Sequence, residues 1–489
     1  MNVLHIIPRF IGGGPERHLL ALAAAWRGAG FETRHRIVVL DPPISTPLLI
    51  KARLLGISLL ATPADDVLDS AIREADVVEI TYWNHPRLLD LLRRKLPPAR
   101  VLLRCAVAGT APPQVLGSDL GQFADAMIIT SLASLETPAA RHATDSGMPL
   151  EFIPALADMS RLEGFIPRAH TGIRVGYLGL VEATKMHPHF AELVAAVRDP
   201  EVSFDVYGDG SGGPGLQRRL AELGAGGRVR FHGHVEDLRA AFAEMDVFGY
   251  PLAPDTWATS EKTIQEAMWA GIPPVVLAGT GASGLVEHGR TGLVCETEAE
   301  YAPMIERLAS DIGLRRQLGD AARDFARRQF DPVQNSARFH AVFDAVAAVP
   351  RRNREPLPGL GASAARRFVL GLGELAGPFV ASLGGSPEFP RRVVAEADAS
   401  IAKCSAVLAR GEGGIIHYRN AFPDDGFLRL WSGLVAAHAG DRATAAREFD
   451  AAAGLGVPPG RIRDAVAVVP GFESVPGPAT GDAGVKSLI

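Results

Sequence analysis

Residues 259–278, TSEKTIQEAMWAGIPPVVLA, contain a helix that leads directly into a strand. Thr259 and Ser260 are residue types that cap helix N-termini, and apolar side chains follow at helical spacing. Gly271 can end the helix, and the two prolines after it prevent the helix from continuing. The letters VVL then indicate a short buried strand. A helix that runs into a buried strand is typical of an α/β nucleotide-binding domain.

The start of this helix carries two carboxylates, Glu261 and Glu266, with Lys262 between them. Negative charge in the first turn suits the helix dipole, so helix capping explains Glu261 well. Capping explains Glu266, in the second turn, less well. Both carboxylates could instead accept hydrogen bonds from a ribose or a sugar in a cleft.

Strands and helices alternate along two long parts of the chain. The first series begins with NVLHII at residues 2–7, and a second series begins with IRVGYLG at residues 173–179. Such alternation predicts parallel sheets with helices on both faces. We therefore expect an α/β fold with two doubly wound, Rossmann-like domains, at residues 1–155 and 156–350. They should face each other across a cleft, with ligands at the carboxyl ends of the strands.

The C-terminal part, residues 356–489, is Ala-rich and predicted to be helical. Residues 439–459 have the small-residue and aromatic spacing of a tetratricopeptide unit, although a plain helical extension is the simpler explanation. We expect a chain that ends near Arg354 to fold and to bind its ligand, and the extension to contact a protein partner. The competing expectation is that the apolar run 368–383 packs against the preceding domains.

Composition and charge exclude several classes of protein. The 489 residues carry a formal net charge of −5, which argues against a nucleic-acid partner. Three cysteines far apart in sequence give neither a disulfide framework nor a metal-binding spacing. No stretch is long and apolar enough for a membrane span, and the first ten residues lack the basic region of a signal peptide. We expect a cytoplasmic protein, with the inner face of a membrane as the alternative location.

Two further stretches suit the binding of a phosphate group. Gly12, Gly13 and Gly14 follow the first strand, where they permit close backbone approach and where the next helix points free N–H groups at a ligand. Lys185 lies where a strand leads into a helix, and it is one of only six lysines in the chain. Each also has a simpler interpretation, a flexible loop and a solvated lysine.

Residues 173–335 resemble the donor-binding half of retaining glycosyltransferases of family four, which have the GT-B fold. The resemblance rests on YLG followed by Lys185, and on VYGDG, VRFHGHVEDLRAAFAEMDVFGYP, QEAMWAGIPPVV and GLVEHGRTGLV. The first domain adds IIPRFIGGGPERH, which is similar to the family's N-terminal glycine loop. The resemblance covers both α/β domains and is specific as an ensemble.

The resemblance implies a metal-independent, cofactor-free enzyme that moves a sugar, with retention, from a nucleotide-diphosphate sugar to a hydroxyl of a glycan, lipid or protein. The first domain would face the acceptor and the second would hold the donor. Glu266 would bind the ribose and Lys185 the diphosphate. The setting would be glycan or glycolipid assembly in a bacterium. The expected donor-binding residues are Gly13, Gly14, Lys185, Ser260, Lys262, Glu266, Gly281, Ala282 and Ser283.

Three positions depart from the family's pattern. Leu180 stands where the family has an arginine, and Ala258 stands where many relatives have a glutamate near the sugar. Glu261 could replace that glutamate as a catalytic residue. The family's histidine after a strand of the first domain is absent, and His85 is the nearest catalytic substitute. An aromatic loop that packs the domain edge explains His85 equally well.

These departures leave two alternatives open. One is a degenerate GT-B protein that binds a glycan or a protein partner without catalysing transfer. The other, with weaker support, is a sugar-nucleotide epimerase of the same fold.

Overall fold

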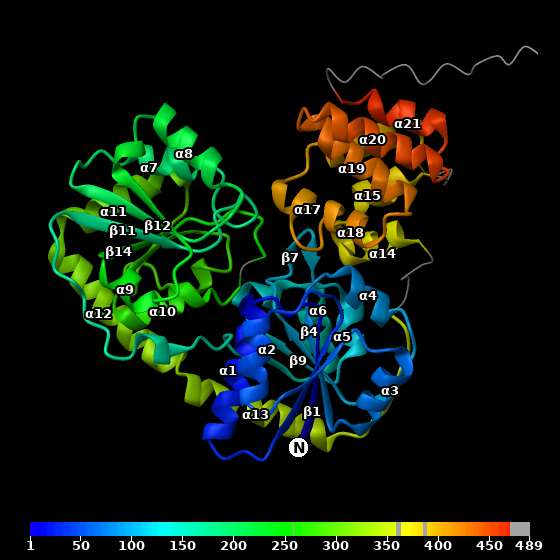
Figure 1. Cartoon of the computed structure of the whole chain (residues 1–489), viewed down its shortest axis with the longest axis horizontal. Coiled ribbons are helices and arrows are strands. Elements are labelled where there is room, and N and C mark those ends of the chain that lie inside the picture. Colours follow the sequence, from blue (N-terminus) through cyan, green and yellow to red (C-terminus); the bar gives the residue numbers. More distant parts are fainter. Residues whose placement is uncertain (258, 358–362, 385–388, 470–489) are drawn as a thin grey trace, which may run out of the picture.

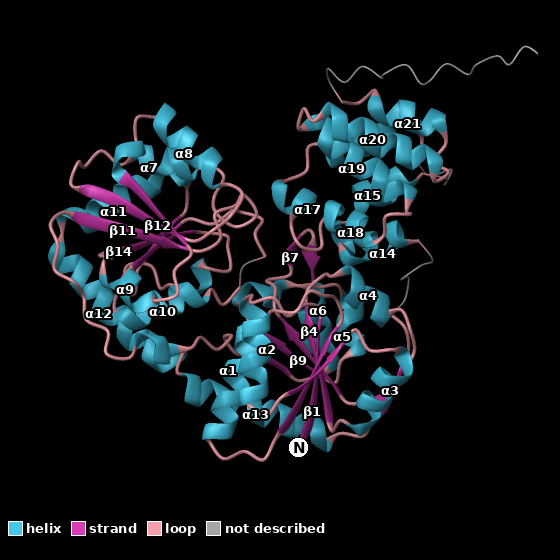
Figure 2. Cartoon of the chain, in the orientation of Figure 1, coloured by secondary structure: helices cyan, strands magenta, loops and turns pink. Residues whose placement is uncertain are grey.

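The computed structural model describes residues 1–257, 259–357, 363–384 and 389–469, so Ala258 lies outside the described residues. The chain forms a first α/β domain (blue to cyan), a second α/β domain (green) and a helical extension (yellow to red) that lies against the first domain (Figure 1). Helices flank the strands of both sheets (Figure 2). This confirms the predicted fold class of two Rossmann-like domains followed by helices.

The first domain contains a seven-stranded sheet whose neighbouring strands all pair in parallel. Chain order reverses between β1 and β4, so the loops after these two strands border a crevice at the carboxyl edge of the sheet. In spatial order the strands are β10 (Leu150–Phe152), β9 (Ala126–Ile129), β6 (Val101–Cys105), β4 (Val77–Tyr82), β1 (Asn2–Ile7), β2 (Arg34–Val39) and β3 (Ser58–Ala61).

Helices cover this sheet, and β4 and β6 are consequently buried along their whole length. The helices are α1 (Gly14–Gly28), α2 (Thr46–Leu54), α3 (Asp65–Glu74), α4 (Pro86–Leu92), α5 (Ser118–Phe123) and α6 (Pro138–Ser146), and the minor strands are β5 (Leu96–Ala99), β7 (Thr110–Ala111) and β8 (Gln114–Val115).

The second domain repeats this plan with a six-stranded parallel sheet that reverses its order between β11 and β14. Its strands in spatial order are β13 (Val229–Gly233), β12 (Val202–Tyr207), β11 (Ile173–Leu178), β14 (Val247–Tyr250), β15 (Pro274–Leu277) and β16 (Leu293–Cys295). Its helices are α7 (Phe190–Ala196), α8 (Gly213–Glu222), α9 (Leu238–Ala243), α10 (Lys262–Ala270), α11 (Tyr301–Ser310) and α12 (Ile312–Gln329).

The helix and strand expected in residues 259–278 are present as α10 and β15. Gly271 ends α10 at a φ of 81°, a left-handed conformation that glycine adopts without steric cost. Strand β15 is buried at all four positions, as its apolar letters predict.

After α12 the chain returns to the first domain. Helix α13 (Pro332–Ala348) packs on α1, and Trp26 Nε1 donates a hydrogen bond to the Ser336 carbonyl at 2.8 Å. Strand β17 (Arg352–Arg354) then pairs antiparallel with β5. The range 156–350 therefore includes a helix whose core contacts are with the first domain.

The extension shares the hydrophobic core of the first domain. Helices α14 and α18 pack against α4, and the fully buried Phe368, Trp431 and Leu88 belong to one apolar cluster. The extension's helices are α14 (Ala364–Gly371), α15 (Gly377–Leu383), α16 (Arg391–Ala402), α17 (Ala406–Arg410), α18 (Ile415–Ala421), α19 (Gly426–His438), α20 (Arg442–Gly454) and α21 (Pro459–Val466).

This shared core contradicts the expectation that the α/β body is complete without the extension. Truncation near Arg354 would expose the part of the first domain that α14 and α18 cover. The competing expectation, that the apolar run from residue 368 packs on the preceding domains, is the one the structure supports. Helices α19 and α20 form a tightly packed pair, in which Gly433 leaves room for the Phe449 ring.

None of the described helices is both long and apolar enough to cross a lipid bilayer.

We predict that Phe368→Ala lowers the free energy of unfolding by about 3–5 kcal/mol, because it leaves a cavity in a fully buried cluster. Leu375→Ala is the matched control within the extension, since Leu375 is 49% exposed and should change stability by about 0.5 kcal/mol or less. Urea unfolding of the full chain measures both effects. Equal effects of the two substitutions would contradict the shared core.

Candidate functional site

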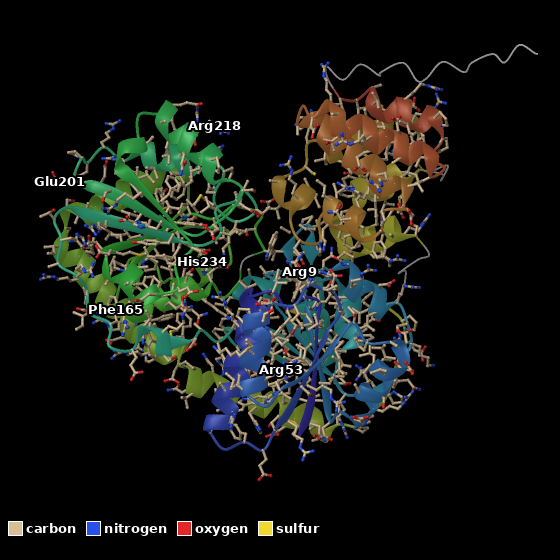
Figure 3. All side chains as sticks on the ribbon, in the orientation of Figure 1. Arg9, Arg53, Phe165, Glu201, Arg218 and His234 are labelled. Carbon is tan, nitrogen blue, oxygen red and sulfur yellow. The ribbon has the colours of Figure 1, made fainter. Side chains whose placement is uncertain are left out.

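A cavity of about 370 Å³ lies where the carboxyl edges of the two sheets meet. The loops after β1, β4, β6 and β9 line it from the first domain, and the loops after β11 and β14 line it from the second. One residue of the extension, Glu412, completes the lining. Arg9, from the loop after β1, marks the place where the three parts of the chain meet (Figure 3).

The glycine loop forms one wall of the cavity, as predicted. Gly12 adopts a φ of 118°, and Gly13 precedes α1 without any side-chain cap. The first backbone N–H groups of this 15-residue helix are therefore available to a ligand. Glu16 supports the loop from inside, where its carboxylate accepts a hydrogen bond from the Ile11 amide at 3.2 Å. The loop and helix together form a site suited to an anion.

The opposite wall carries a partly buried ion pair. Lys185 Nζ lies 2.9 Å from the Glu261 carboxylate, and Tyr250 donates its hydroxyl to the same carboxylate at 2.6 Å. Burial alone would lower the pKa of Lys185, but Glu261 raises it above its usual value. Burial would likewise raise the pKa of Glu261, but Lys185 holds it below its usual range. Both side chains are therefore charged.

This arrangement corrects the capping interpretation of Glu261. The residue occupies the position before α10, yet its side chain makes no capping hydrogen bond with the helix. The carboxylate instead turns to Lys185, on the loop after β11. Lys185 is likewise not a solvated surface lysine, since its side chain is 29% exposed and paired.

Lys262 connects the two domains across the cavity. Its Nζ donates a hydrogen bond to the Gly14 carbonyl at 2.6 Å. Burial lowers the pKa of Lys262 to about 7, so its charge responds to pH near neutrality. Glu266, one turn further along α10, is 4% exposed, and burial raises its pKa to about 7. Glu266 does not line the cavity.

The other expected donor-binding residues are Ser260, Gly281, Ala282 and Ser283. Ser260 lines the cavity, but its hydroxyl donates to the Thr130 carbonyl and accepts from the Ala155 amide at 3.1 Å. The Ser260 hydroxyl therefore connects the two domains and has no free hydrogen to donate to a ligand. The structure does not bring Gly281, Ala282 and Ser283 to the cavity.

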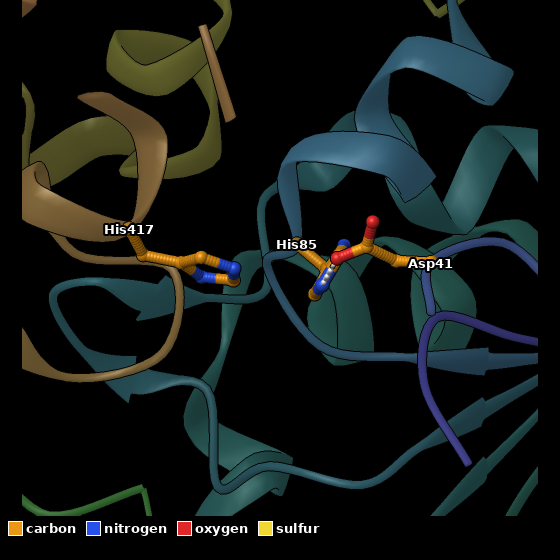
Figure 4. Close-up of side chains that lie close together, drawn as sticks. All are labelled: Asp41, His85 and His417. Carbon is orange, nitrogen blue, oxygen red and sulfur yellow. Dashed lines mark ion pairs between the residues drawn. The ribbon is translucent and has the colours of Figure 1, made fainter. Parts of the chain in front are cut away.

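His85 lies behind the cavity wall. It is fully buried, and its Nδ1 accepts the Arg87 amide at 3.2 Å at the start of α4. Its neighbours are Asp41, at 3.7 Å from Nε2, and His417 of the extension, whose ring centroid lies 4.8 Å away (Figure 4). Burial lowers the pKa of His85 well below its usual value. Of the aromatic loop, Trp83 lines the cavity and His85 does not.

The Asp41, His85 and His417 side chains are close enough together to hold a metal ion. Both rings, however, accept backbone N–H groups at Nδ1, His85 from Arg87 and His417 from Gly413 at 2.9 Å. A neutral imidazole that accepts at Nδ1 carries its proton at Nε2, where a metal would bind. The donor set therefore does not fit a metal ion.

Arg104 is a cavity residue that sequence reasoning missed. It is 1% exposed on β6, its Nε pairs with Glu79 of β4, and its Nη2 donates to Thr81 Oγ1 at 2.6 Å. Arg104 holds the pKa of Glu79 well below its usual value against the effect of burial. The sequence did contain a signal for this pair. Glu79 and Arg104 carry opposite charges within the apolar strands VVEIT and VLLRC, and a buried charge requires a partner.

The family comparison concerns the second domain. Residues 172–311 match the family described as Glycosyl transferases group 1. The chain is 31% identical over 144 residues to the lipopolysaccharide core biosynthesis glycosyltransferase LpsE of Rhizobium meliloti. It is 29% identical over 206 residues to a GDP-mannose-dependent alpha-mannosyltransferase of Mycolicibacterium smegmatis. These matches cover 29% and 41% of this chain and 42% and 52% of the relatives, about half of their length.

Solved structures show that the two-domain arrangement is the GT-B fold. HepE of Anabaena, in complex with UDP and glucose, superposes with a TM-score of 0.58 at 17% identity. The lipopolysaccharide glycosyltransferase WaaG superposes with a TM-score of 0.51 at 13% identity. Each match covers 71% of this chain and 100% of the other chain.

We predict a coupling energy of about 1–3 kcal/mol between Lys185 and Glu261, because the two charges are in contact and partly buried. A double-mutant cycle with Lys185→Met and Glu261→Gln, read by urea unfolding, measures it. The exposed pair Glu287 and Arg290 is the control and should couple by about 0.5 kcal/mol or less. Equal coupling in the two pairs would show that the cavity pair is an ordinary surface contact.

Proposed function

We propose that this protein is a glycosyltransferase that moves a sugar from a nucleotide-diphosphate sugar to an acceptor hydroxyl. The observation that carries the proposal is the cavity between a helix N-terminus with a glycine loop and the partly buried Lys185, which lies in the segment that matches Glycosyl transferases group 1. An anion that binds there would contact both sheets at their switch points.

The donor's diphosphate would lie between Gly13, Gly14 and Lys185. The N–H groups at the start of α1 would donate to phosphate oxygens, and Lys185 would neutralise their charge. As the bond between sugar and phosphate breaks, negative charge grows on the leaving phosphate, where these fixed positive groups stabilise it. Glu261 would act as a positioning residue, because it holds Lys185 at this wall.

The nucleoside would extend along α10 towards Glu266. A carboxylate accepts hydrogen bonds from two adjacent hydroxyl groups of a ribose, and those bonds are stronger when the carboxylate is ionised. Lys262 would remain near the phosphates, because its hydrogen bond to Gly14 already places its Nζ at the glycine loop.

Retention would follow if the acceptor hydroxyl attacks the anomeric carbon from the same face that the phosphate leaves. The leaving phosphate would take the proton of that hydroxyl. Four cationic side chains at the cavity could stabilise the diphosphate without a metal ion: Arg17, Arg104, Lys185 and Lys262. The relatives act in lipopolysaccharide core biosynthesis or use GDP-mannose, so we propose a bacterial glycan or glycolipid as the setting. The inner face of the cytoplasmic membrane is a suitable place for such an acceptor.

The direct test is incubation of the full chain with UDP-glucose and GDP-mannose, followed by measurement of released nucleoside diphosphate. A transferase should release it slowly by transfer to water when no acceptor is present. A degenerate GT-B protein would bind a donor and release nothing. Absence of both binding and release for every donor would contradict the proposal.

We predict that Lys185→Ala weakens the binding of UDP or GDP, whichever the protein binds, by about 1.5–3 kcal/mol, the range for a hydrogen bond to a charged group. Binding of the corresponding nucleoside should not change, because it lacks the phosphates. Lys95→Ala is the control, since Lys95 is 61% exposed and pairs with Glu355 away from the cavity. Isothermal titration calorimetry measures all three proteins. Unchanged diphosphate affinity in Lys185→Ala would remove this residue from the site.

We also predict that nucleoside diphosphate binding takes up protons at pH 8. Lys262 has a pKa of about 7 and is mostly neutral at pH 8, and an adjacent diphosphate favours its charged form, which raises the pKa. The contribution of Lys262 to affinity should therefore fall as pH rises from 6 to 8, and the difference between the native protein and Lys262→Met isolates it from Glu266, whose pKa is also about 7. Calorimetry in buffers of different ionisation enthalpy measures the uptake, and Lys262→Met should abolish it. Equal uptake in the variant would assign the proton to another group.

A further inference from the structure

A glycine-rich turn of the extension, Gly411–Gly414, connects α17 to α18. This turn reaches the cavity between the two α/β domains. Gln114 Nε2 of the first domain donates to the Glu412 carbonyl at 2.6 Å. The Glu412 side chain then projects to the cavity, where its carboxylate lies 3.2 Å from Arg9 Nε. Nothing in the donor site described above uses this carboxylate.

The turn is fitted closely between both α/β domains. A Cβ at Gly413, whose φ is 78°, would lie 2.4 Å from the Asn84 carbonyl oxygen. A Cβ at Gly411 would lie 2.7 Å from the Trp257 ring of the second domain. Glycine is therefore required at both positions for steric reasons, and the backbone of the turn has little freedom to move. This holds Glu412 in one place.

Two buried polar atoms at Glu412 make no hydrogen bond of good geometry, although the carboxylate is ion-paired with Arg9. Oε1 of Glu412 is buried without a hydrogen bond, since its contact with Arg9 has no hydrogen-bond geometry. The indole Nε1 of Trp83, a cavity residue only 6% exposed, is also buried without a hydrogen bond. Burial raises the pKa of Glu412, against the opposing effects of Arg9 and of the nearby Trp83 N–H. Buried polar atoms without hydrogen bonds are costly, and hydroxyl groups of a ligand could satisfy both of these atoms.

The chemistry of these groups matches a sugar. A hydroxyl group both donates and accepts, so adjacent hydroxyls can donate to the Glu412 carboxylate and accept from the Trp83 N–H and the Arg9 guanidinium. A simple lipid alcohol or a serine offers one hydroxyl and would leave part of this set unsatisfied. Arg9, which pairs with Glu412, and Trp83 both belong to the first domain and line the cavity.

We propose that the Gly411–Gly414 turn builds the acceptor subsite, in which Glu412 binds hydroxyl groups of a carbohydrate acceptor. The proposal rests on the proposed glycosyltransferase function and specifies its acceptor class. It gives the extension a part in substrate recognition in addition to its part in the core.

The test uses the full chain, with UDP or GDP bound, and two simple probes, methyl α-D-glucopyranoside and methyl α-D-mannopyranoside. Saturation-transfer NMR should detect binding of at least one glycoside to the native protein. Glu412→Gln keeps the shape and removes the charge, and it should weaken glycoside binding by at least about tenfold. Glu412→Asp, which withdraws the carboxylate by one methylene, should also weaken it.

The matched control is Glu396→Gln, because the Glu396 side chain on α16 is 63% exposed. This variant should bind the glycoside as the native protein does. Nucleoside diphosphate affinity should be equal in all four proteins. Failure of the native protein to bind either glycoside, or equal glycoside binding by Glu412→Gln, would overturn the subsite. Loss of nucleotide binding in both Glu412 variants would show that Glu412 is needed for folding and would also overturn the proposed acceptor subsite. Failure of the native protein to bind either nucleotide would instead overturn the proposed function.

Discussion

The partly buried contact between Lys185 and Glu261 keeps Lys185 charged, and the proposed chemistry depends on that charge. A lysine buried without a counter-charge tends to lose its proton, and it would then attract no phosphate. Glu261 prevents this, and the Tyr250 hydroxyl satisfies a second lone pair of the same carboxylate. The two carboxylates at the start of α10 thus have different surroundings. Glu261 is kept ionised by a cation, whereas burial raises the pKa of Glu266 to about 7.

Parallel sheets bring the residues of this cavity together from distant parts of the chain. Each strand places its following loop at the carboxyl edge, so the loops after β1, β4, β11 and β14 converge at the switch points of the two sheets. Interdomain hydrogen bonds then hold the edges in register, among them Lys262 to Gly14 and Ser260 to Thr130. The extension packs on α4, and its Gly411–Gly414 turn contacts both α/β domains and supplies one wall residue of the cavity.

Local patterns were sufficient to predict the fold and part of the site. Helix α10, its end at Gly271 and strand β15 follow from residues that are neighbours in sequence, and the glycine loop and Lys185 follow from their place after strands. The rest depends on partners far away in the chain. The pairing of Arg104 with Glu79 requires the order of β4 and β6, and the place of Glu412 requires the docking of the extension. The sequence could not show that the Ser260 hydroxyl is hydrogen-bonded to the backbone of Thr130 and Ala155.

The most direct measurement is a crystal structure of the full chain with UDP-glucose or GDP-mannose. The account predicts that the diphosphate lies within hydrogen-bond distance of Lys185 Nζ and of the backbone amides at Gly13 and Gly14, with the ribose at Glu266. A donor bound with its phosphates away from Lys185 and the glycine loop would contradict it.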